Sequence, residues 1–258
     1  MYSCSNYPVI EKNEIASGIF SYTILCPEVA VEAKPGQFVH VRVEGFTLRR
    51  PISISDIDKK KGTIRIIFEV RGKGTLKMTN TNVGEEIDMI APLGNGFTLP
   101  EQLPDGKKIA VIGGGIGVPP LYAVAKKYGE KASVILGFRS HDKIILKSDF
   151  SALGADVAIC TDDGSYGIKG LVTLPLVEQL EKNEIAGIFA CGPMPMLKAI
   201  VNASKLYNVP CQVSLEQRMG CGVGACVGCA CTIRKNGRNF TLRVCKDGPV
   251  FNGEEVVF

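Results

Sequence analysis

The chain has 258 residues, of which 45% are hydrophobic and 22% charged, and its formal net charge is +4. This length exceeds that of a small disulfide-stapled scaffold and suffices for two domains with cores of their own. The mild charge is spread along the sequence and argues against a nucleic-acid-binding protein, and no apolar run approaches the roughly 20 residues of a membrane span. The first residues show no basic segment followed by an apolar one, so we expect a cytoplasmic protein without a membrane attachment.

Between residues 7 and 95 the sequence predicts short β-strands. Apolar or alternating stretches at 18–26, 37–43, 63–70 and 86–93 are separated by turn-forming residues, with no helical stretch among them. This pattern is typical of a small antiparallel barrel. The segment LRRPISIS at 48–55 combines arginine, proline and serine on a strand, which could bind a pyrophosphate by charge and a flavin edge by hydrogen bonds. Taken alone, this segment is better explained as an ordinary barrel strand than as a flavin site.

Two glycine-rich turns follow, and the group of motifs is more specific than any single one. RGKGT at 71–75 could offer backbone N–H groups to phosphate oxygens, and APLGNGF at 91–97 closes the barrel segment. Over about the first hundred residues the chain resembles the flavin domain of the ferredoxin–NADP reductase superfamily, although its GKGT turn is compact. The resemblance implies FAD, while Arg49 could equally be an ordinary surface charge. The implied FAD-binding residues are Arg50, Pro51, Ile52, Ser53, Ile67, Phe68, Glu69, Gly74 and Thr75.

After residue 105 predicted strands and helices alternate, which favours a parallel sheet. Residues 107–129 predict a strand, a glycine turn and a helix with prolines at its start, and further strands are expected at 132–138, 156–165 and 184–193. A glycine run between strand and helix can bind phosphate, but it is also common as a structural turn. The region resembles the pyridine-nucleotide half of the same superfamily. Its candidate binding residues are Gly113, Gly114, Gly115, Gly117, Cys191 and Gly192.

The residues after the third predicted strand favour NAD over NADP. Superfamily members that use NADPH place serine and arginine there, whereas this chain has Asp162 and Asp163. Carboxylates accept hydrogen bonds from a ribose diol and repel a 2′-phosphate. Arg139 is the one residue that argues for NADP.

Four of the ten cysteines lie within residues 221–231, among glycines. Cys221, Cys226 and Cys229 have the C-x4-C-x2-C spacing of plant-type [2Fe–2S] ligation, with Cys245 as a distant fourth ligand. A zinc site more often has two separated C-x2-C pairs, and disulfides are rare in a reducing compartment. Cys231 would point away from the cluster in an extended segment, but the choice of third ligand between Cys229 and Cys231 stays open. Buried apolar cysteines would not explain so many glycines.

Together these motifs resemble the electron-transfer subunits of the two-subunit, NAD-linked dihydroorotate dehydrogenases of type B, over nearly the whole chain. The resemblance implies a multidomain α+β protein with an FAD-binding antiparallel barrel at 1–100, an NAD-binding α/β domain at 101–210 and a [2Fe–2S] domain at 211–258. It also implies an FMN-containing catalytic subunit as partner, in a heterotetramer with two copies of each chain. That subunit would oxidise dihydroorotate to orotate in pyrimidine synthesis and send electrons through the cluster and FAD to NAD⁺.

Neither histidine, His40 or His141, is assigned a catalytic role; both are interpreted as structural or surface residues. Two alternatives remain from the sequence. One is an NAD(P)H–ferredoxin reductase or hydrogenase diaphorase-type subunit with the same cofactors. The other is a non-catalytic redox-sensing or zinc-stabilised module, which a colourless zinc-containing preparation would indicate.

Overall fold

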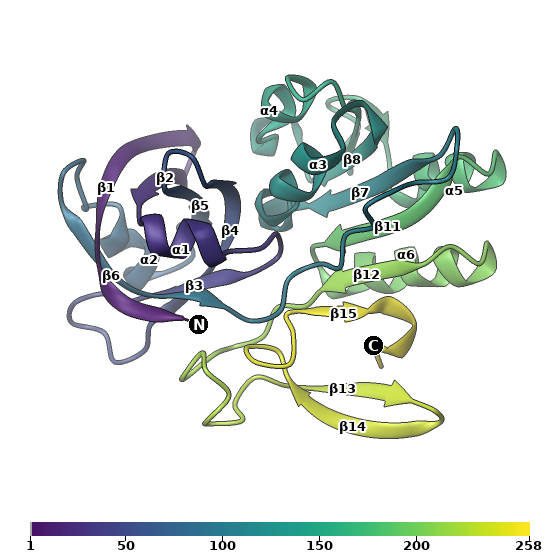
Figure 1. Ribbon diagram of the computed structural model, residues 1–258. Helices are drawn as coiled ribbons and strands as arrows, with labels where there is room; N and C mark the ends of the chain where they lie inside the picture. Colours follow the sequence, from purple (N-terminus) through teal and green to yellow (C-terminus); the bar gives the residue numbers. More distant parts are fainter. Residues whose placement is uncertain (1) are drawn as a thin grey trace. The chain divides into compact units, whose positions relative to one another are not determined.

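Six strands close into an antiparallel barrel in the computed structural model, which describes residues 2–258 (Figure 1). Their order around the barrel is β1-β2-β5-β4-β3-β6, so the predicted barrel is confirmed. The barrel strands are β1 (Ser3–Ala16), β2 (Ile19–Leu25), β3 (Phe38–Val41), β4 (Arg50–Asp58), β5 (Thr63–Glu69) and β6 (Glu86–Leu93).

The interior of the barrel is filled by alternate residues of these strands. Tyr22, Ile54 and Phe68 are almost fully buried there, and the rings of Tyr22 and Phe68 meet edge to face with centroids 5.2 Å apart. The hydroxyl of Tyr22 donates a hydrogen bond to the carbonyl of Met78 at 2.6 Å, which satisfies its buried polar group.

Two short helices interrupt the barrel strands, so the expectation of no helical stretch is wrong. They are α1 (Pro27–Glu32) and α2 (Lys73–Met78), each of six residues. Proline is favourable at the start of α1 because the first helical N–H needs no partner. Thr75 organises the start of α2, where its hydroxyl accepts the N–H of Arg71 at 2.9 Å. Helices this short carry too little hydrophobic periodicity to be recognised in the sequence.

The second sheet has seven strands in the order β10-β9-β8-β7-β11-β12-β15. Neighbouring strands are parallel except for the antiparallel pair of β12 and β15, as predicted for an α/β domain. Predicted strands are confirmed at β7, β8, β9 and β11, while the others are too short to be recognised. The strands are β7 (Lys108–Gly114), β8 (Ala132–Phe138), β9 (Asp156–Thr161), β10 (Ile168–Lys169), β11 (Ile185–Cys191), β12 (Cys211–Ser214) and β15 (Val250–Asn252).

The chain passes outward from β7 through β8 to β9 and then returns to β11 on the other side of β7. The strand order therefore reverses between β7 and β11, and open α/β sheets bind ligands at the carboxyl ends of strands at such a point. The connecting helices are α3 (Tyr122–Tyr128), α4 (Lys147–Ser151), α5 (Thr173–Glu181) and α6 (Met194–Leu206). Two 3₁₀ turns, Gly115–Gly117 and Pro119–Leu121, precede α3, so this helix begins later than predicted.

The C-terminal part contains a hairpin of β13 (Ala230–Lys235) and β14 (Arg238–Arg243). Its Asn236–Gly237 turn has positive φ at both residues, as a two-residue hairpin turn requires. By packing, the chain forms two units. One contains the described residues through Gly96 with Glu216–Cys231 and Thr241–Pro249; the other contains Phe97–Leu215, Thr232–Phe240 and Val250–Phe258.

The predicted division at residues 100 and 210 stays a prediction about where the cofactor sites begin and end. Residues 211–258 contribute to both packing units, and Cys221, Cys226, Cys229 and Cys245 all belong to the barrel's unit. Across residues 2–258, every helix is too short or too polar to cross a lipid bilayer.

Candidate functional site

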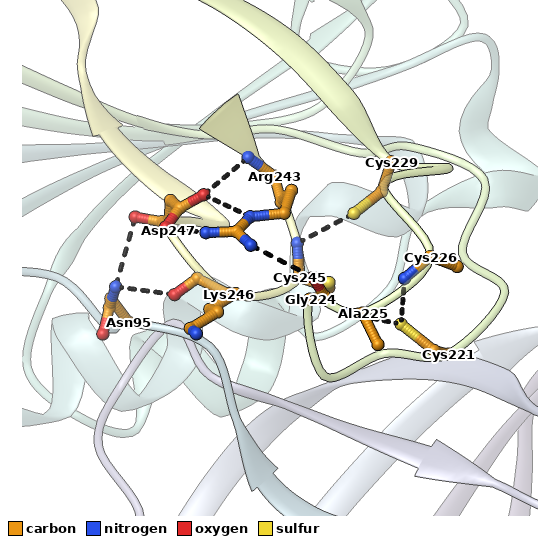
Figure 2. A network of polar contacts seen from close by, with 10 residues as sticks. All are labelled: Asn95, Cys221, Gly224, Ala225, Cys226, Cys229, Arg243, Cys245, Lys246 and Asp247. Atoms are coloured by element: carbon orange, nitrogen blue, oxygen red, sulfur yellow. Dashed lines mark hydrogen bonds and ion pairs between the residues drawn. The ribbon is translucent and has the colours of Figure 1, made fainter. Parts of the chain in front are cut away.

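The four predicted cluster ligands form two linked pairs (Figure 2). The Sγ of Cys221 accepts hydrogen bonds from the N–H groups of Ala225 at 3.2 Å and Cys226 at 3.4 Å. The Sγ of Cys229 accepts one from the N–H of Cys245 at 3.3 Å. Such N–H donors favour the thiolate, which is the metal-binding form. Two pairs also suit a [2Fe–2S] cluster, because each of its two irons takes two thiolates.

Burial differs across the four sulfur positions. Cys229 and Cys245 are buried, Cys221 is half-buried and Cys226 is exposed. Burial raises the pKa of Cys221, but the N–H groups of Cys226 and Val223 outweigh it and lower that pKa to about 6. Burial and the adjacent thiol of Cys229 raise the pKa of Cys245 to about 12. The four sulfur positions therefore range from buried to solvent-exposed.

The backbone of this loop has an unusual shape. Gly222 and Gly224 have positive φ, and so does Val227 at +58°, although its side chain is β-branched. Such a conformation persists only where the surroundings determine it, and it fits a loop that wraps a ligand. Among residues 2–258, no three His, Cys, Asp or Glu side chains are placed as a site for a single metal ion. Four thiols in two linked pairs fit the two irons of a [2Fe–2S] cluster.

An arginine braces the segment that carries Cys245 against the rest of the loop (Figure 2). The Nε of Arg243 lies 2.9 Å from Oδ2 of Asp247, and its Nη1 donates to the carbonyl of Gly224 at 3.1 Å. The Nδ2 of Asn95, just after β6, donates to the carbonyls of Lys246 at 3.0 Å and Asp247 at 3.1 Å. These residues could not be found from the sequence, because no local pattern connects Asn95 with a segment 151 residues away.

Cys231 lies in β13, in the extended conformation expected for it. Burial, and then the neighbouring Cys229, raise its pKa to about 11. In the described part of the chain no backbone N–H donates to its sulfur, whereas Cys229 is linked to Cys245. These contacts favour Cys229 as the third ligand, and the assignment stays a prediction.

The structure brings together two of the predicted flavin residues, Arg50 of β4 and Gly74 of α2. A Cβ atom at position 74 would lie 2.4 Å from Nη2 of Arg50, so glycine lets the guanidinium rest on the backbone. The guanidinium also lies over the Phe46 ring, 5.0 Å from its centroid. Arg49 instead pairs with Asp88 at 2.6 Å, so its charge is engaged within the barrel strands rather than free at the surface. A fixed cation beside an open backbone turn suits a pyrophosphate.

The other predicted flavin residues divide by the face of the barrel to which they belong. Pro51 and Ser53 are half-buried, whereas Ile52 packs against the barrel core. The side chains of Phe68 and Ile67 are both buried, and that of Phe68 lies in the barrel core. A flavin could therefore reach only the backbone groups of these two residues.

Glu69 and Thr75 are engaged within their own turn. Glu69 accepts the Nε–H of Arg71 at 2.7 Å, and the hydroxyl of Thr75 accepts N–H groups of the same turn. Thr75 thus shapes the turn at the start of α2.

The candidate nucleotide residues after β7 and β11 meet at the point where strand order reverses. A Cβ atom at Gly117 would lie 2.5 Å from the carbonyl oxygen of Cys191, and one at Gly192 would lie 3.0 Å from the N of Gly114. Gly115 has a positive φ of 53° and open space around its Cβ position. Its backbone is therefore the part of the turn that a phosphate could approach closely.

Replacing Gly117 by alanine should destabilise the α/β unit, because the added methyl group would collide with the fixed carbonyl of Cys191. Overpacking of this kind costs about 1–3 kcal/mol, or roughly 2–10 °C in melting temperature. Gly187→Ala in β11 is the matched control, since its Cβ would meet Ile109 at an ordinary 3.5 Å. Thermal unfolding followed by circular dichroism measures both. Equal melting temperatures would contradict the close approach of the two turns.

The two aspartates after β9 differ in their contacts. The carboxylate of Asp163 accepts hydrogen bonds from the N–H of Ser165 at 2.9 Å and from its hydroxyl at 2.6 Å, which lower the pKa of Asp163. Asp162 is exposed beside it. Only β8 lies between β9 and β7, so two strand spacings separate the aspartates from the glycine turn. This distance is about 10 Å, measured across the strands. Asp163 organises the turn, and Asp162 is the better candidate for a ribose. Arg139 directly follows the neighbouring strand β8, and its carbonyl accepts the N–H of Asp163.

The two histidines have different surroundings. His141 is exposed, with its ring 5.3 Å from that of Tyr166. His40 is completely buried, and in the described part of the chain neither ring nitrogen makes a hydrogen bond of normal geometry. The burial of His40 could not be predicted from the sequence, because a histidine between two valines is compatible with any strand of the barrel.

Two protein-family models match the chain. Residues 216–257 match the iron-sulfur cluster binding domain of dihydroorotate dehydrogenase B. Residues 111–202 match the oxidoreductase NAD-binding domain. The first contains all four predicted cluster ligands, and the second contains the glycine turn and both aspartates.

Curated relatives match along nearly their full length. The chain is 42% identical over 255 residues to the electron transfer subunit of dihydroorotate dehydrogenase B (NAD(+)) of Bacillus caldolyticus, covering 96% of each chain. It is 40% identical over 252 residues to that of Caldanaerobacter subterraneus, covering 97% of each. A solved structure of an NADH-dependent reduced ferredoxin-NADP oxidoreductase is 31% identical with a TM-score of 0.85, covering 99% of this chain and 91% of that one.

Proposed function

The chain belongs to the family of electron-transfer subunits of dihydroorotate dehydrogenase B (NAD⁺), and on that premise we propose its partner and electron path. It is an oxidoreductase subunit that binds FAD, a [2Fe–2S] cluster and NAD. Electrons come from an FMN-containing catalytic subunit that oxidises dihydroorotate to orotate in pyrimidine synthesis. They pass through the cluster and FAD of this chain to NAD⁺. The complex is a cytoplasmic heterotetramer with two copies of each subunit.

The observation that carries this proposal is that the cysteine loop, Glu216–Cys231, packs with the flavin barrel. Glu216–Cys231 and Thr241–Pro249, which hold the four cysteines, belong to the same unit as the barrel strands. One unit thus contains both the thiols that suit a one-electron carrier and the Arg50 guanidinium, which lies beside Gly74 and suits a flavin pyrophosphate. Bound FAD supplies the conversion between one- and two-electron transfer.

The residues of this chain have distinct tasks in that transfer. The cysteine thiolates hold the cluster, with N–H groups of the loop stabilising their charge. Arg50 binds the flavin pyrophosphate, and the turn at Gly115 binds that of the nucleotide. Dihydroorotate loses two electrons and two protons, NAD⁺ takes up both electrons and one proton, and the second proton is released to solvent.

Copurification tests the partner. A tagged copy of the chain, expressed in its own host, should retain an FMN-containing subunit in equal amount, identified by mass spectrometry and by FMN released on denaturation. The structural likeness to a ferredoxin-NADP oxidoreductase makes a ferredoxin-linked subunit the second candidate. Recovery of such a subunit without FMN would contradict the proposal, and so would a colourless protein that carries zinc.

Asp162→Arg should shift nucleotide preference from NADH toward NADPH. The change removes a carboxylate that accepts the ribose hydroxyls and supplies a cation for the 2′-phosphate, while the Asp163–Ser165 turn is retained. We expect the ratio of kcat/KM for NADH to that for NADPH to fall roughly tenfold or more. Ferricyanide reduction at varied nucleotide concentration measures it. An unchanged ratio would mean that the ribose binds elsewhere.

A further inference from the structure

The imidazole of His40 lies on the outer face of β3, yet it is completely buried. Its neighbours Val39 and Val41 belong to the barrel core, so the alternation of the strand turns His40 outward. The cysteine loop covers it there, because a Cβ atom at Gly222 would lie 2.4 Å from its Nδ1. Gly222 directly follows the predicted ligand Cys221. The backbone beside that ligand therefore rests on the imidazole ring.

The same face of the barrel carries Pro51 and Ser53 of the predicted flavin segment. His40 is paired with Pro51 across the two strands, and Phe38 with Ser53. Side chains directly opposite each other on an antiparallel pair are close neighbours, about 4.5–5.5 Å apart at Cβ. Pro51 and Ser53 are half-buried, so part of this surface is accessible to solvent. His40 thus has the flavin segment on one side and the cysteine loop on the other, within one packing unit.

The ring nitrogens of His40 lack partners of normal hydrogen-bond geometry among the described residues. Burial, followed by the charge of Arg49, lowers the pKa of His40, although the carbonyl groups of Cys221 and Arg49 lie near enough to favour protonation. An imidazole ring has at least one N–H donor whether it is neutral or protonated. Buried polar groups are nearly always hydrogen-bonded, so this side chain needs an acceptor that the loop can bring into place.

We propose that His40 is a positioning residue that sets the rate of electron transfer between FAD and the cluster. The inference rests on the proposed function. The Nδ1–H of His40 donates to the carbonyl of Cys221 when the cysteine loop is closed around the cluster, and this bond holds the loop against the flavin face of the barrel. Losing it lets the loop move away from that face. Electron transfer between two separated centres slows as the distance between them grows, so this movement lowers the rate.

Three variants of the complete two-subunit protein test the role of Nδ1. His40→Leu fills the site without a donor, His40→Asn places an amide N–H near the position of Nδ1, and His40→Gln places one near Nε2. His141→Leu, at the exposed histidine of the other unit, controls for loss of a histidine. The measurements are FAD and iron content, the electron paramagnetic resonance spectrum of the reduced cluster, and the stopped-flow rate at which saturating NADH reduces the cluster through FAD.

We expect His40→Leu to retain FAD and to reduce the cluster severalfold more slowly, with an altered cluster spectrum. His40→Asn should restore both rate and spectrum, while His40→Gln should not. A Leu variant with the wild-type rate and spectrum overturns the inference. If the Leu variant loses iron, retention of iron by the Asn variant supports the inference and equal loss overturns it. A wild-type protein without flavin or iron would refute the proposed function instead.

Discussion

Changing Cys221, Cys226, Cys229 or Cys245 to serine should remove most of the iron and sulfide from the protein. A hydroxyl is a harder and far less acidic ligand than a thiol, so each change deprives one iron of a thiolate. Iron and sulfide analysis and the visible spectrum measure the loss. FAD should remain, so NADH oxidation by ferricyanide should persist.

Cys231→Ser is the matched control, because Cys231 belongs to the same loop sequence but lies in β13. It should retain iron, and it should support electron transfer between the partner subunit and NAD⁺. Loss of iron in Cys231→Ser together with retention in Cys229→Ser would show that Cys231, and not Cys229, is the third ligand. Retention of iron in all five variants would show that this loop does not hold a cluster.

Replacing Arg50 by alanine should strip FAD from the protein. The guanidinium lies against the Gly74 backbone, where it can form charge-assisted bonds to a pyrophosphate worth about 1.5–3 kcal/mol each. Loss of even one such bond weakens FAD binding roughly tenfold or more. The flavin released on denaturation, relative to protein concentration, measures occupancy.

Arg49→Ala offers the matched control, since the adjacent arginine is paired with Asp88 rather than placed beside Gly74. It should keep its flavin, although the loss of the ion pair lowers stability. Full flavin content in Arg50→Ala, or equal loss in both variants, would show that the pyrophosphate is not bound at the Gly74 turn.

Much of the architecture could be predicted because it is encoded locally. Alternation within residues 63–70 and the apolar run at 132–138 each identify a strand from its own residues, and β5 and β8 lie there. The 3₁₀ turns before α3 were missed because Pro119 and Pro120 fit the first turn of an α-helix equally well. The shared packing of residues 211–258 was missed because it depends on distant contacts, such as that of Asn95 with Lys246.

The candidate sites show the same division. The cysteine spacing and the aspartates after β9 are local patterns, and they indicate the kind of site before the fold is known. Which aspartate is free for a ribose depends on the hydrogen bonds from Ser165, and these need the folded turn. Phe68 belongs to the flavin segment by resemblance, yet strand alternation places its side chain inside the barrel. His40 became a candidate only when strand pairing and the approach of Gly222 were known.

The most direct test of the central claim is dihydroorotate-dependent reduction of NAD⁺ by the purified complex, followed by NADH absorbance. The complex should form one NADH for each orotate. The catalytic subunit alone should oxidise dihydroorotate with an artificial acceptor but leave NAD⁺ unreduced, and adding this chain with its iron and FAD should restore NADH formation. NADH formation by the catalytic subunit without this chain, or a complete complex that reduces ferredoxin but never NAD⁺, would contradict the account.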